Sequence, residues 1–182
     1  MSKAGAGCAL LRHRLRFYAV VRDKAALATF VKQQNERDAL YRYRQDKQYD
    51  FLVSQLFRQL RQMADETEIC FARRGTKPRN DALERALEEA ATLFEGRFGF
   101  RHPGRQTVVS STPAETACLQ AVDYFLWALQ RFYERKEDRF LELIWPQVSE
   151  INDLDIVHER RTGALFTQKR PLTLSIWDSG KK

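Results

Sequence analysis

One stretch, residues 107–133, constrains the fold of this chain more than any other part of its sequence. It opens with TVVS at 107–110, a short β-branched run that is typical of a buried strand. Thr112 then suits a helix cap, Pro113 suits the first helical position, and Glu115 completes a capping box. The sequence therefore predicts a strand that leads directly into a helix, as in α/β folds.

The predicted helix places a carboxylate, Asp123, within an apolar stripe. The stripe repeats every three or four residues and consists of Leu119, Val122, Leu126, Leu129 and Tyr133. An ionised carboxylate in such a place is costly unless it is paired, hydrogen-bonded or bound to a metal. Two roles for Asp123 follow: a structural partner of an Arg or a loop amide, which is the commoner case, or a catalytic and metal-binding residue.

The remaining segments continue an alternation of strands and helices. Strands are predicted at 15–21 and 68–72, and helices at 23–34, from Asp38, from Asp81 and at 140–145. The helix from Asp38 would bury Tyr49, Leu52, Val53, Leu56, Leu60 and Met63. The helix from Asp81 would bury Leu83, Ala86, Leu87, Ala90 and Phe94, and Gly96 and Gly99 would break it.

This order predicts an α/β fold with a mainly parallel sheet flanked by helices. We expect a single domain over residues 15–177, a flexible arm over 1–14 and a disordered tail over 178–182. No apolar run reaches the roughly 20 residues of a membrane span, and the N-terminus lacks a signal core. The scattered Cys8, Cys70 and Cys118 are typical of reduced thiols, so we expect a cytoplasmic protein with no membrane association.

Charge is unevenly distributed along the chain. Residues 1–79 contain 17 Lys and Arg against 8 Asp and Glu, a net +9, whereas residues 80–182 have a net charge of −2. Such asymmetry favours a polyanionic partner for the first half, with nucleic acid the obvious candidate. A solvated basic surface on an ordinary protein explains the same asymmetry equally well.

Two basic segments are candidate nucleic-acid contacts. The loop after the second predicted strand contains Arg73, Arg74, Lys77 and Arg79 around a Gly and a Pro, and Arg can grip phosphate oxygens in bidentate fashion. The segment 39–49 interleaves Arg42 and Arg44 with tyrosines, a pattern that suits stacking on single strands. A helix with inward tyrosines and solvated arginines is at least as common a reason for that second pattern.

Several runs of the sequence, taken together and in order, resemble the domain of unknown function 3800 family. The strongest likeness is LQAVDYFLWALQRFYERKEDRF at 119–140, followed by IW, NDLD and RPLTL, with the looser IVHERRTGALF between the last two. YDFLVSQLF at 49–57 and TEICFARRG at 67–75, with the helix from Asp81, match further upstream. The likeness runs from about Leu15 to about Leu174 and is strongest from Leu119 to Trp145.

This resemblance implies an incomplete ribonuclease H-like, three-layer fold and a metal-dependent nuclease activity. Asp123 would be the acid of the last core helix that helps to hold Mg²⁺ or Mn²⁺. The family's first strand ends in an Asp-Glu-Ser-Gly-like motif, which this sequence lacks, and Ser110, Ser111 and Thr112 stand where an acid is usual. Two-metal hydrolysis needs several carboxylates, so the resemblance implies a truncated or degenerate nuclease.

Three hypotheses follow from the sequence: a metal-dependent nuclease, a non-catalytic module that binds nucleic acid or a protein, and a shortened copy of a longer nuclease. The missing first hairpin would expose a sheet edge, so we expect self-association or pairing with a partner strand. Asp153 and Asp155 are a weaker metal candidate, because such a pair more often marks a turn or an exposed strand face.

Overall fold

A computed structural model of the chain describes residues 15–58, 66–73, 80–100, 104–158 and 161–177. Contacts between residues divide the chain into two compact units. We call Met1–Asp23 together with Gln120–Lys182 the terminal unit, and Lys24–Leu119 the central unit. The sequence predicts one domain over 15–177, whereas each of these units has a hydrophobic cluster of its own.

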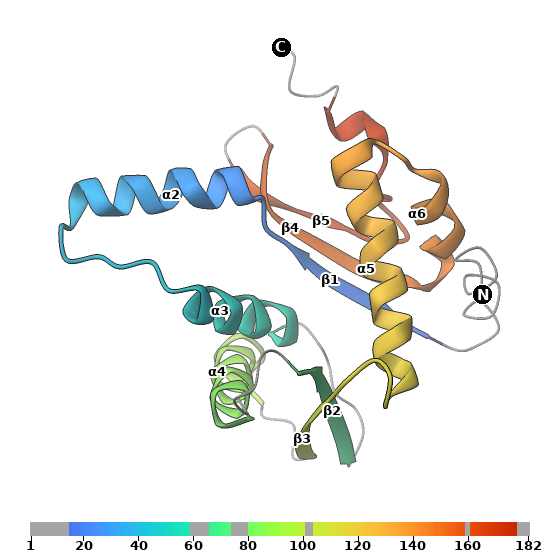
Figure 1. The fold of residues 1–182 in the computed structure, drawn as a ribbon, viewed down its shortest axis with the longest axis horizontal. Helices are drawn as coiled ribbons and strands as arrows, with labels where there is room; N and C mark the ends of the chain where they lie inside the picture. Colours follow the sequence, from blue (N-terminus) through green and yellow to red (C-terminus); the bar gives the residue numbers. More distant parts are fainter. Residues whose placement is uncertain (1–14, 59–65, 74–79, 101–103, 159–160, 178–182) are drawn as a thin grey trace. The chain divides into compact units, whose positions relative to one another are not determined.

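The terminal unit contains a three-stranded sheet in the order β1–β4–β5 (Figure 1). Strand β1 (Phe17–Val21) pairs in parallel with β4 (Val148–His158), and β4 pairs antiparallel with β5 (Arg161–Phe166). Gly163 in β5 has a φ of +99°, a left-handed conformation that other residues rarely adopt, and it lies against the backbone of Asp153. The first strand is thus joined in parallel to a strand from near the other end of the sequence.

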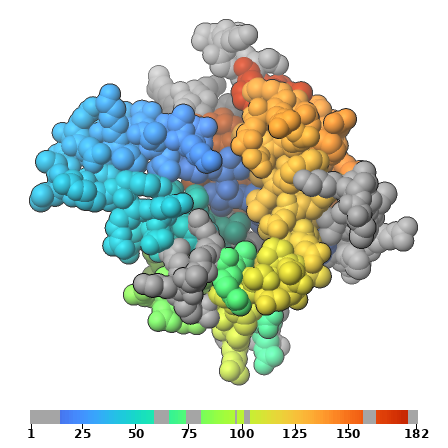
Figure 2. Space-filling model, viewed as in Figure 1, coloured from blue at the N-terminus to red at the C-terminus, as the bar shows by residue number. Residues whose placement is uncertain are grey.

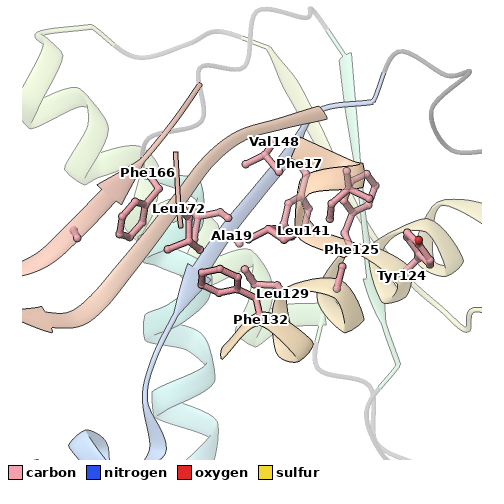
Figure 3. Close-up of a cluster of buried hydrophobic side chains, with 14 residues drawn as sticks. Phe17, Ala19, Tyr124, Phe125, Leu129, Phe132, Leu141, Val148, Phe166 and Leu172 are labelled. Carbon is pink, nitrogen blue, oxygen red and sulfur yellow. The ribbon is translucent and has the colours of Figure 1, made fainter. Parts of the chain in front are cut away.

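Helix α5 (Ala117–Arg135) covers this sheet, and α6 (Arg139–Ile144) follows it. Figure 3 shows aromatic and aliphatic side chains from α5, α6 and the three strands meeting in one cluster. Phe17 of β1 stacks on Phe125 of α5 with ring centroids 4.7 Å apart. The largest fully buried side chains of this cluster are Phe132, Leu141, Ile144, Val148 and Ile151.

The buried face of α5 is not the stripe that the sequence predicts. Leu119 and Leu129 are buried, but Val122 and Leu126 are 43% and 48% exposed. The face that packs on the sheet consists of Tyr124, Phe125, Ala128, Leu129 and Phe132. Because α5 is apolar on two sides, its sequence alone predicted the wrong side, and Asp123 is exposed rather than part of the buried stripe.

The helix α4 (Asn80–Phe98) of the central unit confirms its predicted face. Every residue expected to point inward is buried: Leu83, Ala86, Leu87, Ala90 and Phe94. The predicted break at Gly96 is wrong, because the helix continues to Phe98 and ends before Gly99, whose φ is +75°. A left-handed glycine is a common way to end a helix, so the second of the two glycines stops it.

Strands β2 (Glu66–Ala72) and β3 (Arg105–Ser111) of the central unit pair in parallel over their full length. Ile69 packs with Val53, Leu83, Ala86 and Leu87, so helix α3 (Gln45–Phe57) and α4 cover one face of this pair. The predicted helix from Asp38 begins only at Gln45, which leaves Arg42 and Arg44 in a loop. Leu60 and Met63 lie outside the described residues.

Helix α2 (Lys24–Arg37) precedes that loop and contains no buried residue. In the space-filling view of Figure 2 its side chains lie on the surface of the molecule. The sequence predicts this helix at 23–34, close to the observed bounds. The spacing of its apolar residues predicted a helix. Those residues are not buried, and Phe30, for example, is 42% exposed.

The fold is mixed α/β, and two of the three strand pairings between described residues are parallel, as the sequence predicts. The strands form two sheets within the part of the chain that the structure describes, whereas the sequence predicts one. β1 pairs there only with β4, so its second edge has no partner among the described strands. No helix in the described residues is long and apolar enough to cross a membrane.

Candidate functional site

The strongest candidate site lies at the carboxyl ends of the parallel pair β2–β3. Ala72 and Ser111 are the last partners of this pair, and the backbone N–H of Arg73 donates to the Ser111 carbonyl at 2.8 Å. Ligands of open α/β sheets bind outside the carboxyl ends of the strands. The exposed Arg73 therefore lies at the edge where such folds place their sites.

Hydroxyl groups from the turn after β3 surround the same edge. The Ser111 Oγ and the Thr116 Oγ1 are 2.6 Å apart, and the backbone N–H and the hydroxyl of Thr112 donate to Glu115 Oε2 at 3.0 and 2.9 Å. Thr112 and Glu115 are therefore hydrogen-bonded, but the prediction that Thr112 caps the helix and that Pro113 is its first residue is wrong. The hydrogen-bonded pair closes a turn at 113–115, and α5 begins after it at Ala117.

Glu115 is the negative group of this edge. Hydrogen bonds from the Thr112 hydroxyl, the Thr112 N–H and the Ser111 hydroxyl hold the pKa of its carboxyl below the ordinary value, and the charge of Arg73 adds to this. Glu115 therefore stays ionised at neutral pH and attracts the same guanidinium that a phosphate would need. An anionic ligand at Arg73 has to compete with this carboxylate.

A pair of thiols lies next to this edge. Cys70 of β2 is half-buried, Cys118 in the first turn of α5 is exposed, and their side chains are hydrogen-bonded to each other. Burial raises the pKa of the Cys70 thiol, the neighbouring Cys118 raises it further, and a hydrogen bond from Thr116 opposes both. The sequence indicated only scattered thiols and gave no reason to pair these two.

The predicted basic residues are only partly within the described structure. Arg73 is described and exposed, whereas Arg74, Lys77 and Arg79 lie outside the described residues. Arg42 and Arg44 are exposed in the loop before α3, where the Arg42 guanidinium donates to the carbonyls of Ala39 and Tyr41 at 2.8 Å. Part of the hydrogen-bonding capacity of Arg42 is therefore already used by its own loop.

The interleaved tyrosines of this segment do not share one role. Tyr43 is 42% exposed and free to offer a ring face to a base, while Tyr49 packs against the hydrophobic cluster of the central unit. The expectation of inward packing is thus confirmed at Tyr49, and the expectation of base stacking stays a prediction. Stacking on bases is left to the exposed ring of Tyr43.

Asp153 is buried in the terminal unit, where the sequence predicts a turn, an exposed strand face or a metal site. It is 3% exposed, its Oδ2 accepts a hydrogen bond from the Tyr133 hydroxyl at 2.6 Å, and its Oδ1 accepts from the N–H groups of Asp155 and Ile156. These three donors stabilise a buried carboxylate and tie α5 to the irregular part of β4. We assign Asp153 a structural role.

The neighbouring Asp155, which lies within β4, binds the residues that follow the end of β1. Its Oδ2 accepts the Asp23 N–H at 2.6 Å, and its Oδ1 lies 3.5 Å from Arg22 Nε. Arg22 and Asp23 directly follow β1, so this carboxylate fixes the point where β1 leaves the sheet. The Asp155 carboxylate is therefore satisfied by a backbone N–H and a guanidinium.

The fold adds no support for a metal site at Asp123 among the described residues. Asp123 is exposed on α5, so the prediction that its carboxylate lies within a buried stripe is wrong. Within the described ranges, no group of three or more His, Cys, Asp or Glu side chains is arranged to hold a metal ion. A role of Asp123 in binding Mg²⁺ or Mn²⁺ stays a prediction that rests on the family resemblance.

Comparisons with known proteins add no assignment. No protein-family model matches this sequence, and no curated protein and no solved structure is significantly similar to it. The likeness to the domain of unknown function 3800 family and the ribonuclease H-like fold therefore stay predictions. The function has to be argued from the residues of the chain itself.

Proposed function

We propose that this chain binds single-stranded nucleic acid through the loop that begins at Arg73, without cleaving it. The observation that carries this proposal is the position of Arg73 at the carboxyl ends of β2 and β3, at the start of the run of Arg74, Lys77 and Arg79. Phosphate contacts come mostly from Arg, Lys, hydroxyl side chains and backbone N–H groups. Arg73 supplies a guanidinium at this edge, and Ser111 and Thr116 supply hydroxyls beside the same edge.

The charge of the chain supports a polyanion as the ligand. Residues 42–79, which include β2, the basic run after it and the Arg42–Arg44 segment, contain 9 Lys and Arg against 5 Asp and Glu, and so contribute +4 of the net +9 of residues 1–79. Tyr43, between two arginines, supplies an exposed ring on which a base can stack. Because every base has a ring face, stacking and phosphate contacts together predict binding with little sequence preference.

Binding is favoured over cleavage because of the carboxylates. Two-metal hydrolysis places several acidic ligands around cations about 4 Å apart. Asp123 lies exposed on α5, Asp153 is occupied by three donors, and Asp155 is occupied by Arg22 and the Asp23 N–H. These acids of the described chain thus already have structural roles or stand apart.

Salt titrations of binding test the proposal. Fluorescence anisotropy with labelled oligo-dT and oligo-U should give affinities that fall steeply with salt, with a slope of about −0.7 for each phosphate that is neutralised. Replacing the four loop cations by Ala should weaken binding at least about tenfold and flatten this slope. A matched control removes the same charge elsewhere, by changing Arg135, Arg139, Lys169 and Lys181 to Ala.

The control separates a site from a general effect of charge. Equal losses in the loop variant and the control variant would remove the loop from the binding site and leave only non-specific attraction. Glu115→Gln provides an independent check in the opposite direction, because it removes the carboxylate that competes for Arg73. We expect it to tighten binding roughly twofold to fivefold, an effect that weakens with salt.

Cleavage is tested in the same samples. Incubation of the labelled oligonucleotides with Mn²⁺ or Mg²⁺ should leave them intact on a denaturing gel. Metal-dependent cleavage by the wild-type chain that Asp123→Asn abolishes would replace our proposal by the nuclease that the family resemblance implies. Contaminating nuclease would instead persist in the Asp123→Asn sample.

A further inference from the structure

The two faces of the β2–β3 pair are covered differently. Ile69 and Phe71 of β2 pack in the hydrophobic cluster with α3 and α4. Side chains alternate along a strand, so Cys70, which lies between them, points to the opposite face. Figure 1 shows the chain leaving β3 through a turn and entering the start of α5.

The start of α5 brings two side chains to Cys70. The Cys70 thiol is hydrogen-bonded to the side chains of Thr116 and Cys118, and Thr116 is held in turn by Ser111 at the end of β3. Two cysteines 48 positions apart in the sequence are therefore neighbours within the central unit. Because a disulfide requires two cysteines that are close in space, this neighbouring pair is a candidate for one.

We propose that Cys70 and Cys118 form a reversible disulfide when the protein meets hydrogen peroxide. The exposed Cys118 thiol reacts first and gives a sulfenic acid and water. The Cys70 sulfur then attacks the Cys118 sulfur, so that the S–S bond forms, the S–OH bond breaks, and the hydroxyl leaves as water with the Cys70 proton. Two thiols are oxidised by two electrons, and one peroxide is reduced to two waters.

The environments of the two thiols assign their order. Cys118 is exposed and open to peroxide, whereas Cys70 is half-buried and shielded. Burial raises the pKa of the Cys70 thiol, so its thiolate fraction, and with it the rate of the second step, increases as the pH rises. We therefore expect disulfide formation to be faster in mildly alkaline solution than at neutral pH.

The cross-link would join Cys70 of β2, three residues before Arg73, to Cys118 in the first turn of α5. It closes a long loop of the chain, and such links stabilise a fold chiefly by restricting its unfolded state. The oxidised protein should therefore have a melting temperature higher by on the order of 5 °C. This inference does not depend on nucleic-acid binding.

Peptide mapping of the full chain tests the proposal. The Cys8→Ser variant, treated with hydrogen peroxide and then with a thiol-blocking reagent, should lose about 2 Da without blocking. Trypsin should release one linked pair, residues 62–73 with residues 106–131, which dithiothreitol separates. Raising the pH from about 7 to about 8.5 should increase the rate several-fold.

Control variants make the outcome decisive. Cys70→Ser and Cys118→Ser, each combined with Cys8→Ser, should lose the linked peptide and the rise in melting temperature. Because Cys118 is exposed, its replacement should leave the fold intact, which the unoxidised melting temperature checks. Cys118 oxidised to sulfinic acid beside a free Cys70, or linkage only between two molecules, would overturn the proposal.

Discussion

The two units differ in how completely they exclude water. The cluster of the terminal unit contains Ile151 with no exposed surface, and four further large side chains are almost as buried, whereas Ile69 in the central cluster keeps 7% exposure. The candidate site residues, which are the thiol pair and Arg73, belong to the less completely buried central unit. Tight packing thus stabilises one unit, while the ends of a smaller sheet present reactive groups.

The two units also treat their carboxylates differently. Asp153 is buried and satisfied by three donors, so it is committed to the fold. Glu115 is exposed and held by hydroxyls of its own turn, so its charge remains available to a neighbouring cation. The lesson is that an acid in this chain contributes to stability where it is enclosed and to ligand competition where it is not.

The largest expected effect comes from truncating the same residue type in both units. Ile151→Ala should lower the free energy of unfolding by about 3–5 kcal/mol, and Ile69→Ala by about 2–3 kcal/mol, because the less enclosed site leaves a smaller cavity. Urea unfolding followed by circular dichroism measures both. Equal losses would show that the contrast in burial has no energetic counterpart.

Tryptophan fluorescence sharpens the same pair of variants. All three tryptophans, Trp127, Trp145 and Trp177, belong to the terminal unit. If the units unfold separately, Ile151→Ala should move the fluorescence transition and Ile69→Ala should leave it in place. Parallel shifts of both signals in both variants would mean that the two units unfold as one.

A smaller effect is expected at the hydrogen bond between α5 and β4. Tyr133→Phe removes the donor to Asp153 Oδ2 and leaves a buried carboxylate oxygen without that partner. The cost should be about 1–3 kcal/mol in the free energy of unfolding. Tyr43→Phe is the control, because its exposed ring should give a change below about 0.5 kcal/mol.

The hydroxyl of Tyr133 should also make the free energy of unfolding decrease in alkaline solution. Burial and the negative charge of Asp153 raise the pKa of Tyr133 above its ordinary value near 10. The unfolded chain therefore loses this proton above about pH 10 while the folded chain keeps it, so the stabilisation is complete below that pH and declines above it. The slope approaches about 1.4 kcal/mol per pH unit for one group.

Comparison with Tyr133→Phe isolates this contribution from those of the other tyrosines. The difference in unfolding free energy between wild type and variant should be constant between about pH 7 and 9 and shrink above about pH 10. A difference that stays constant to the highest pH at which the protein folds would place the Tyr133 hydroxyl in water. Urea titrations at each pH provide the values.

The smallest effect is expected for Asp123→Asn. Because Asp123 is exposed, the change should alter the free energy of unfolding by less than about 0.5 kcal/mol. A loss of several kcal/mol, the scale for breaking a buried ion pair, would show that the carboxylate has a partner that the fold encloses. Thermal melts of both forms, with and without Mn²⁺, also measure any stabilisation by a bound cation.

Local patterns determined much of this fold. The spacing of Leu83, Ala86, Leu87, Ala90 and Phe94 predicted the buried face of α4, since that helix is apolar on one side only. Apolar runs located β1, β2 and β3, whereas β4 and β5 were not predicted, and the helix expected to start at Thr112 begins only at Ala117. The face of α4 and the first three strands depend on neighbours in sequence, so the sequence contains the information that they need.

Only the tertiary structure decided which residues meet across the chain. Helix α5 has apolar residues on two sides, and the sheet that it packs against selected the side with Phe125 and Phe132 and left Asp123 exposed. The burial of Asp153 depends on a hydroxyl from α5, and the pairing of Cys70 with Cys118 depends on a turn after β3. A known strand–turn–helix order could have suggested that last pair, but long-range contacts follow from packing, which local periodicity does not specify.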